Sequence, residues 1–201
     1  MPSPVGGQRP APEPLWLVQA FVNSRDLRTA GDDLGTPARL SAWLDRHGLL
    51  GDGEPASESD LRRAVELREA LRELLLASNG GPTEPATLAL VNRALHDAEP
   101  VVRFLPGGNV ELGVLAPGVT GALGHLLAIA FTAMTDGTWQ RLKACQEATC
   151  RRAFYDHSKN RSGTWCDMAA CGSRAKMRAY YRRRHPTAAD EGAGSDPRLV
   201  Q

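Results

Sequence analysis

The stretches CQEATC (residues 145–150) and CDMAAC (residues 166–171) are separated by 15 residues and contain all 4 cysteines of the 201-residue chain. Two close cysteine pairs separated by about 12 to 20 residues are typical of a structural metal site, because each pair supplies two thiolates from one tight turn. We therefore expect Cys145, Cys150, Cys166 and Cys171 to bind one Zn²⁺ ion in a tetrahedral site.

Spacing alone leaves two other interpretations open, namely free or disulfide-bonded thiols and ligands of an iron–sulfur cluster. The first is disfavoured by the expected location. Residues 1–14 are rich in Pro and lack the basic and apolar regions of a secretory signal peptide, which predicts a cytoplasmic protein, and disulfides are rare there. The second is disfavoured because the residues around the cysteines are basic and polar, which does not suggest electron transfer.

The residues between and after the cysteine pairs predict the shape of the metal site. Residues 156–163 are turn formers, so we expect a hairpin around them, with Phe154 and Trp165 covering the metal. Ser173 is a good N-cap and predicts a helix over 174–184 whose first turn lies at the metal. A knuckle, a hairpin and a helix in this order make a treble-clef-like zinc finger.

Charge is distributed unevenly along the chain. Residues 141–185 contain 12 Lys and Arg against 3 Asp and Glu, a net charge of +9, whereas the rest contains 12 against 20, a net charge of −8. A basic end on an acidic body indicates an anionic partner, and nucleic acid, above all duplex DNA, is the first candidate. The side chains expected to contact it are Arg151, Arg152, Arg161, Arg174, Lys176, Arg178, Arg182 and Arg183. Arg174 is the candidate for reading a guanine, and most of the others are candidates for phosphate contacts.

The residues before the cysteines predict a mainly helical body. Apolar residues recur at helical spacing, and the expected helices span 15–24, 36–48, 57–78, 83–98 and 118–135. In the long helix over 57–78, Arg and Glu are expected on the outside. Two apolar strands around Pro106-Gly107-Gly108-Asn109 predict a hairpin. The uncharged run over 118–134 is shorter than the roughly 20 residues that span a bilayer, so we expect a buried helix.

These observations predict four segments. They are a disordered lead-in over 1–14, a mainly helical body with a small β-hairpin (an α+β domain) over 15–138, the finger over 139–185 and a disordered tail over 186–201. Because the body contains no cysteine, we expect it to fold without the finger and without metal.

A longer pattern runs through both cysteine pairs: Cys145-x4-Cys150, Phe154-x-Asp156-x-Ser158-x-Asn160-Arg161, and Trp165-Cys166-x-Met168-x2-Cys171-Gly172-Ser173-Arg174-x-Lys176. It resembles the CGNR zinc-finger family, with Ser173 where the family name has Asn. The stretches Phe21-Val22-Asn23-Ser24 and Thr36-Pro37-x2-Leu40-x2-Trp43-Leu44-x3-Gly48-Leu49 resemble the ABATE domain that precedes such fingers. Together the resemblance covers about residues 15–185, and it implies a stress-linked transcription regulator that binds DNA through the finger.

Other functions stay open. Asp156-His157 followed by Asn160 is similar to the catalytic hairpin of HNH nucleases, but the helix over 174–184 contains no His or Asn that could serve as a second metal ligand. Zinc closed by four thiolates has no open coordination position, so we expect no enzymatic activity. A structural finger that binds protein is the other alternative. The body is a candidate for homodimerisation or for binding an unknown small molecule, through polar groups such as Asn23 and His125.

Overall fold

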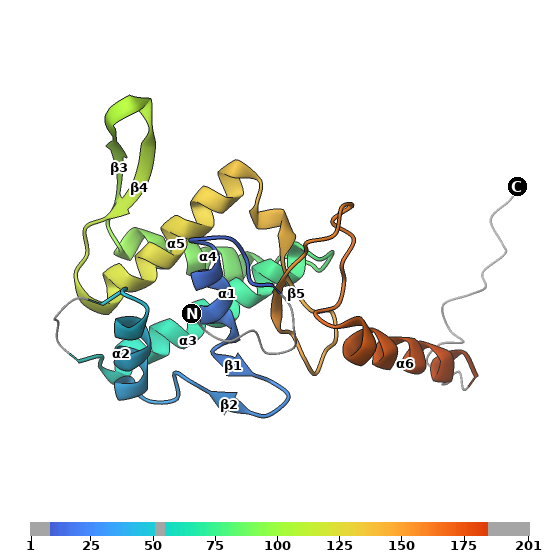
Figure 1. The fold of residues 1–201 in the computed structure, drawn as a ribbon. Helices are drawn as coiled ribbons and strands as arrows, with labels where there is room; N and C mark the ends of the chain where they lie inside the picture. Colours follow the sequence, from blue (N-terminus) through green and yellow to red (C-terminus); the bar gives the residue numbers. More distant parts are fainter. Residues whose placement is uncertain (1–8, 51–54, 185–201) are drawn as a thin grey trace, which may run out of the picture.

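The computed structural model describes residues 9–50 and 55–184, without the side chain of Arg182. The described chain is mainly helical, as predicted, and Figure 1 shows the helices packed into one body with the finger at one end. The helices are α1 (Trp16–Asn23), α2 (Pro37–Arg46), α3 (Glu58–Ala77), α4 (Pro85–Asp97), α5 (Gly118–Asp136) and α6 (Ser173–Arg184). The strands form three antiparallel pairs: β1 (Arg25–Asp26) with β2 (Gly31–Asp32), β3 (Pro100–Phe104) with β4 (Val110–Val114), and β5 (Leu142–Ala144) with β6 (Ala153–Tyr155).

Local signals set the ends of the body helices. Thr36 accepts a hydrogen bond from the backbone N–H of Arg39 at the start of α2, and Gly48, with φ of +65°, follows its end. Ser57 and Asp60 form a reciprocal capping box at the start of α3. Such caps satisfy the N–H groups that the first helical turn leaves unpaired. The predicted helices are therefore confirmed to within a few residues at their ends.

Helix α5 is the buried centre of the body. By length and composition it could cross a membrane, but 56% of its apolar window is buried inside the described fold. Leu126 is fully buried, and Gly124 packs against Ala98 and Val114 at the base of the β3–β4 hairpin. A Cβ at Gly124 would stand only 2.4 Å from the Cβ of Ala98, so this close approach requires glycine. The prediction of a buried helix is confirmed, although His125 within it is exposed.

Two arginines of α3 correct the prediction that its charged residues lie outside. Arg68 is fully buried and donates to both carboxylate oxygens of Asp32, at 2.7 and 3.0 Å. Arg72 is 5% exposed and donates to backbone carbonyls of other segments. A buried guanidinium is tolerated because its donors all find acceptors.

The start of the chain also differs from the prediction. Within the predicted lead-in, Ala11 is buried in the main core, and its N–H donates to Oε1 of Gln19 at 2.8 Å. The packed chain thus begins before residue 15. The rest of the predicted lead-in, residues 1–8, and the predicted tail, residues 186–201, lie outside the described residues.

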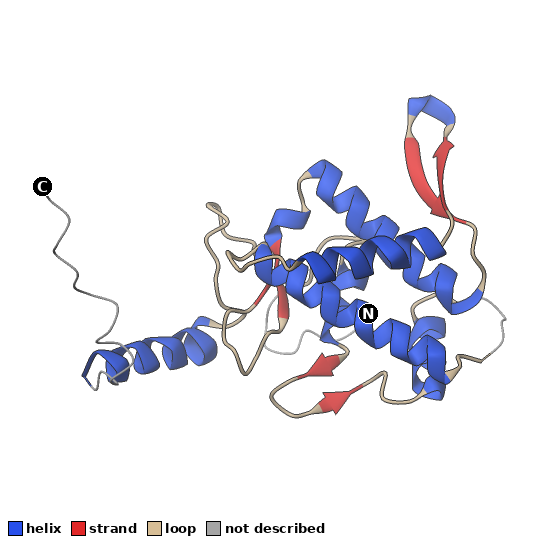
Figure 2. Cartoon of the chain, turned by 180° about the vertical axis from the view of Figure 1, so that it is seen from behind, coloured by secondary structure: helices blue, strands red, loops and turns tan. Residues whose placement is uncertain are grey.

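The hairpin of β3 and β4 projects from the helical body, as both views show (Figures 1 and 2). Phe104 pairs with Val110 near its tip, and the two side chains are 85% and 61% exposed. The predicted hairpin is confirmed, but its outer half does not join the core.

Candidate metal centre

The four cysteines meet in one buried cluster. Their sulfur atoms lie within 4.8 Å of one another, and none of the four forms a disulfide. The Sγ of Cys166 lies 3.6 Å from that of Cys150 and 3.7 Å from that of Cys171. Four thiolates placed about 2.3 Å from one Zn²⁺ ion in a regular tetrahedron lie about 3.8 Å apart, whereas a disulfide needs about 2.0 Å. The sulfur positions therefore fit a zinc ion.

The chemistry of these thiols also fits a cation. A hydrogen bond with Cys150, together with burial, raises the pKa of Cys145 to about 11. Hydrogen bonds with Cys145 and Cys150, together with burial, raise the pKa of Cys166, whereas hydrogen bonds from Cys145 and Cys166 lower the pKa of Cys150. Without a cation, most of the four thiols therefore stay protonated and few are ionised. A divalent cation offsets the repulsion and allows all four to ionise, so metal binding would release protons.

The first cysteine pair occupies the connection between β5 and β6. The N–H of Cys145 donates to the carbonyl of Arg152 at 2.9 Å, and the N–H of Cys150 donates to the carbonyl of Glu147 at 2.8 Å. The predicted hairpin is thus corrected: strand Ala153–Tyr155 pairs backward with Leu142–Ala144, and residues 156–163 form a loop instead of its turn. Because β5 and β6 pair, Cys145 and Cys150 are held together in the short connection between these two strands.

The second cysteine pair lies at a helical entry that begins earlier than predicted. Asp167, not Ser173, is the N-cap, and its carboxylate accepts from the N–H of Ala170 at 2.8 Å. One π-helical turn, Met168–Gly172, carries Cys171 and continues into α6. Phe154 and Trp165 pack against the sulfurs, as predicted. The metal site is thereby shielded by apolar side chains.

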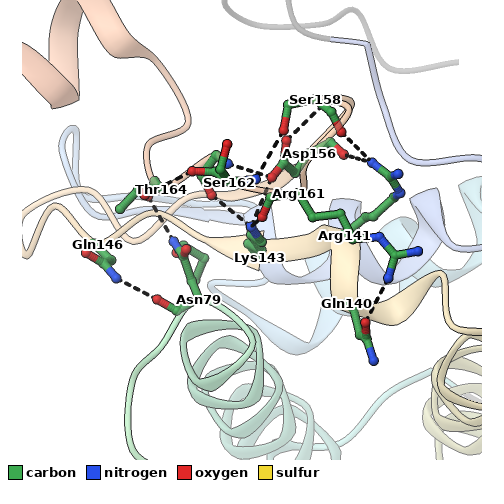
Figure 3. A network of polar contacts seen from close by, with 12 residues as sticks. Asn79, Gln140, Arg141, Lys143, Gln146, Asp156, Ser158, Arg161, Ser162 and Thr164 are labelled. Carbon is green, nitrogen blue, oxygen red and sulfur yellow. Dashed lines mark hydrogen bonds and ion pairs between the residues drawn. The ribbon is translucent and has the colours of Figure 1, made fainter.

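The loop over residues 156–163 is held by a buried ion pair (Figure 3). Nζ of Lys143 donates to the carboxylate of Asp156 at 2.9 Å and to the carbonyls of Arg161 and Gly163. Burial alone would raise the pKa of Asp156, but hydrogen bonds from Ser158 and the Lys143 ammonium hold it well below its usual range. The ionised carboxylate of Asp156 therefore stabilises the conformation of this loop.

The body and the finger share one core, while the expectation that the body also folds by itself stays a prediction. Leu142 and Ala144 of β5 are fully buried in the main hydrophobic cluster with the body helices. Asn23 forms two hydrogen bonds with the backbone of Ala153. The N–H of Ala153 donates to Oδ1 of Asn23 at 2.8 Å, and Nδ2 of Asn23 donates to the carbonyl of Ala153 at 2.9 Å. Asn79 donates to the carbonyls of Ala144 and Thr164 (Figure 3). Body side chains thus complete the backbone hydrogen bonds of the finger.

The predicted nucleic-acid contacts separate into three groups. The first comprises residues with exposed or half-exposed side chains, namely Arg151, Arg152, Arg161, Lys176 and Arg183. In the second, the side chains are also exposed but have partners at the metal site: Arg174 donates to Sγ of Cys171 at 3.7 Å, and Arg178 forms an ion pair with Glu147. The third is Arg182, whose side chain lies outside the described residues. The structure therefore places Arg174 and Arg178 at the metal centre.

Sequence reasoning missed Glu147, Lys143 and Asn79 as site residues. Glu147 lies inside the first cysteine pair and is fully buried, where the Arg178 hydrogen bond holds its pKa below the usual value. A charged residue between two cysteines was the one available signal, and its partner 31 residues away could not be read from spacing. Asn79 directly follows the predicted helix over 57–78, where no local pattern points to the finger.

The nuclease alternative gains no support from this geometry. The carboxylate of Asp156 faces Lys143 and backbone N–H groups, and the His157 ring lies 3.2 Å from the carbonyl of Arg9. Across residues 9–50 and 55–184, the four cysteines are the one group of three or more metal-ligand side chains close enough to share an ion.

Comparisons with known proteins agree with the two parts of the chain. Residues 16–137 match the ABATE family, described as "Putative stress-induced transcription regulator", and residues 141–184 match the CGNR zinc finger. No curated protein matches the chain. Since the ABATE match alone spans more than half of the sequence, the chain belongs to the ABATE family and carries a CGNR zinc finger after its ABATE domain.

Proposed function

We propose that this protein is a cytoplasmic, zinc-dependent regulator of transcription whose finger binds duplex DNA. The observation that carries the proposal is the basic finger itself. Residues 141–185 have a net charge of +9, and α6 contains six basic and no acidic residues. This helix points away from the acidic body (Figure 1). Dense positive charge on a projecting helix is the electrostatic footprint of phosphate binding.

In this proposal the metal has a structural role. Cys145, Cys150, Cys166 and Cys171 would hold Zn²⁺, which supplies the cross-link between the β5–β6 connection and the start of α6. The chain's own residues do the binding: α6 and the loop over 156–163 present basic side chains, and the buried Lys143–Asp156 pair keeps that loop ordered. Four thiolates leave no coordination position for a substrate, which favours a regulator over an enzyme.

The body would act as the regulatory part. A surface cavity of about 240 Å³ opens between α3, α4 and α5, and its lining combines charged residues of both signs with apolar ones, namely Arg63, Glu66, Arg93, Asp97, Leu90 and Leu123. Such mixed lining is typical of sites for small molecules. Because body side chains bond directly to the finger, a ligand or a second copy of the chain bound at the body could alter the finger through this shared core.

The experiment is a titration of zinc-loaded protein with labelled random-sequence duplex DNA at several salt concentrations. If about five basic groups meet phosphates, log affinity should fall with log salt at a slope of about −4.5. Protein treated with a chelator is the control and should lose binding. Selection of bound sequences would then reveal a preferred site. Absence of duplex binding at low salt would refute the proposal and favour a protein-binding finger.

A further inference from the structure

The two sides of α6 have different surroundings. Arg174 and Arg178 lie one turn apart on one side of the helix. Arg178 forms an ion pair with Glu147, whose side chain has no exposed surface. Arg174 donates from Nη2 to the sulfur of Cys171 at 3.7 Å and from Nε to the carbonyl of Ala170 at 3.2 Å. This side of the helix therefore faces the metal centre.

These two arginines connect α6 to both cysteine pairs. Glu147 lies between Cys145 and Cys150, and its carboxylate also accepts from Oγ1 of Thr149 at 3.2 Å. Arg178 thus joins the helix to the first pair, and Arg174 joins it to the second. Zinc with four thiolates carries two negative charges, so guanidinium donors beside the sulfurs stabilise the bound metal.

The opposite side of α6 is open. Two residues along an α-helix correspond to about 200° and five residues to about 140°, so Lys176, Tyr180 and Arg183 all lie roughly opposite Arg178. All three side chains are exposed, as are those of Arg174 and Arg178, so the two sides differ in the groups that their side chains contact and not in exposure. The guanidinium of Arg184 lies 5.0 Å from the centre of the Tyr180 ring, which adds positive charge beside this aromatic surface.

We propose that α6 meets nucleic acid with its outward face, Lys176, Tyr180 and Arg183, while Arg174 and Arg178 hold the helix on the metal centre. This inference rests on the proposed function and specifies its contact surface. Lys176 and Arg183 are the phosphate contacts, and Tyr180 lies between them along the helix. Arg174 and Arg178 are positioning residues, because they act through Cys171 and Glu147 on the geometry of the metal site.

The alternative is that Arg174 and Arg178 leave these partners and contact DNA themselves. The Arg178 side chain is 49% exposed, but Glu147 has no exposed surface, so that exchange would leave a buried carboxylate without its cation, which is unfavourable. It would also remove a donor from a ligating sulfur. The structure thus favours the outward face.

The test compares two double variants of the full chain that each remove two positive charges. The outward variant is Lys176→Gln with Arg183→Gln, and the inward variant is Arg174→Gln with Arg178→Gln. A third variant, Arg46→Gln with Arg62→Gln, removes two exposed charges from the body and serves as the charge-matched control. Each is assayed for zinc transfer to a chromogenic chelator without DNA, and for the salt dependence of duplex binding.

We expect the outward variant to hold zinc like the wild type and to lose about two units of the salt slope, since each phosphate contact contributes about 0.9. The inward variant should lose zinc to the chelator at about tenfold lower chelator concentration or less, in line with the effect of removing partners of metal ligands. The inference is overturned if the inward variant retains zinc normally and flattens the slope as much as the outward one. If the wild type binds no nucleic acid, the proposed function fails, whereas the chelator assay still decides the role of Arg174 and Arg178.

Discussion

Replacing Asp156 by Asn should destabilise the protein by about 3 to 5 kcal/mol, the usual cost of breaking a buried ion pair by removing one partner. Asp156 and Lys143 are 4% and 5% exposed, and their Oδ2 and Nζ atoms are 2.9 Å apart. The substitution removes the negative charge but leaves the Lys143 ammonium buried. Because Lys143 lies between Leu142 and Ala144 of the main core, the loss should affect the whole fold.

Urea unfolding of the zinc-loaded protein, followed by circular dichroism, measures this effect. With a slope of about 2 to 3 kcal/mol per molar urea, the midpoint should fall by about 1 to 2.5 M. The double variant Lys143→Met with Asp156→Leu is the control. Since apolar residues of similar volume often replace a buried ion pair at little cost, its midpoint should lie closer to that of the wild type than that of Asp156→Asn.

The pH dependence gives an independent check. The folded protein holds the pKa of Asp156 below its ordinary value, so the unfolded chain binds the proton more readily. The stability that this carboxylate contributes is therefore complete above the unfolded pKa of about 3.9 and is lost as the pH falls through the lower folded value. The difference in the free energy of unfolding between the wild type and Asp156→Asn should be constant from pH 6 to 8 and shrink below about pH 4. A midpoint shift under about 0.3 M at pH 7 would refute the assignment of the ion pair.

Three further predictions follow from the structure. Cys166→Ser should abolish stoichiometric zinc in metal analysis of the purified protein, and a wild type that contains no zinc would contradict the metal site. Gly124→Ala should cost about 1 to 3 kcal/mol in urea unfolding, because the new methyl would meet Ala98 at 2.4 Å, whereas Gly137→Ala, a site with open space but positive φ, should cost less. Truncation after residue 140 should lower the helical circular dichroism and the unfolding midpoint, since it removes Leu142 from the core; an unchanged midpoint would mean that the body folds by itself.

The sequence by itself determined the features that depend on neighbouring residues. The paired cysteine spacing predicted the ligand cluster, and the predicted helices over 36–48 and 57–78 begin at the residues that cap α2 and α3, because a cap or a knuckle is completed within a few residues. Apolar spacing predicted the body helices and the buried α5 for the same reason. The position of the turn in the β3–β4 hairpin followed from Pro106-Gly107-Gly108-Asn109.

Only the tertiary structure decided which distant groups meet. The strand partner of Ala153–Tyr155 depends on packing against the body, where α3 contacts β5 and Asn23 of α1 bonds to Ala153 of β6. The burial of Arg68 depends on Asp32, 36 residues away, and nothing local distinguishes it from the exposed arginines of α3. The inward direction of Arg178 likewise depends on Glu147, 31 residues earlier. An ionised side chain is buried where an opposite charge is already held in place, and that position is set by the folded chain as a whole.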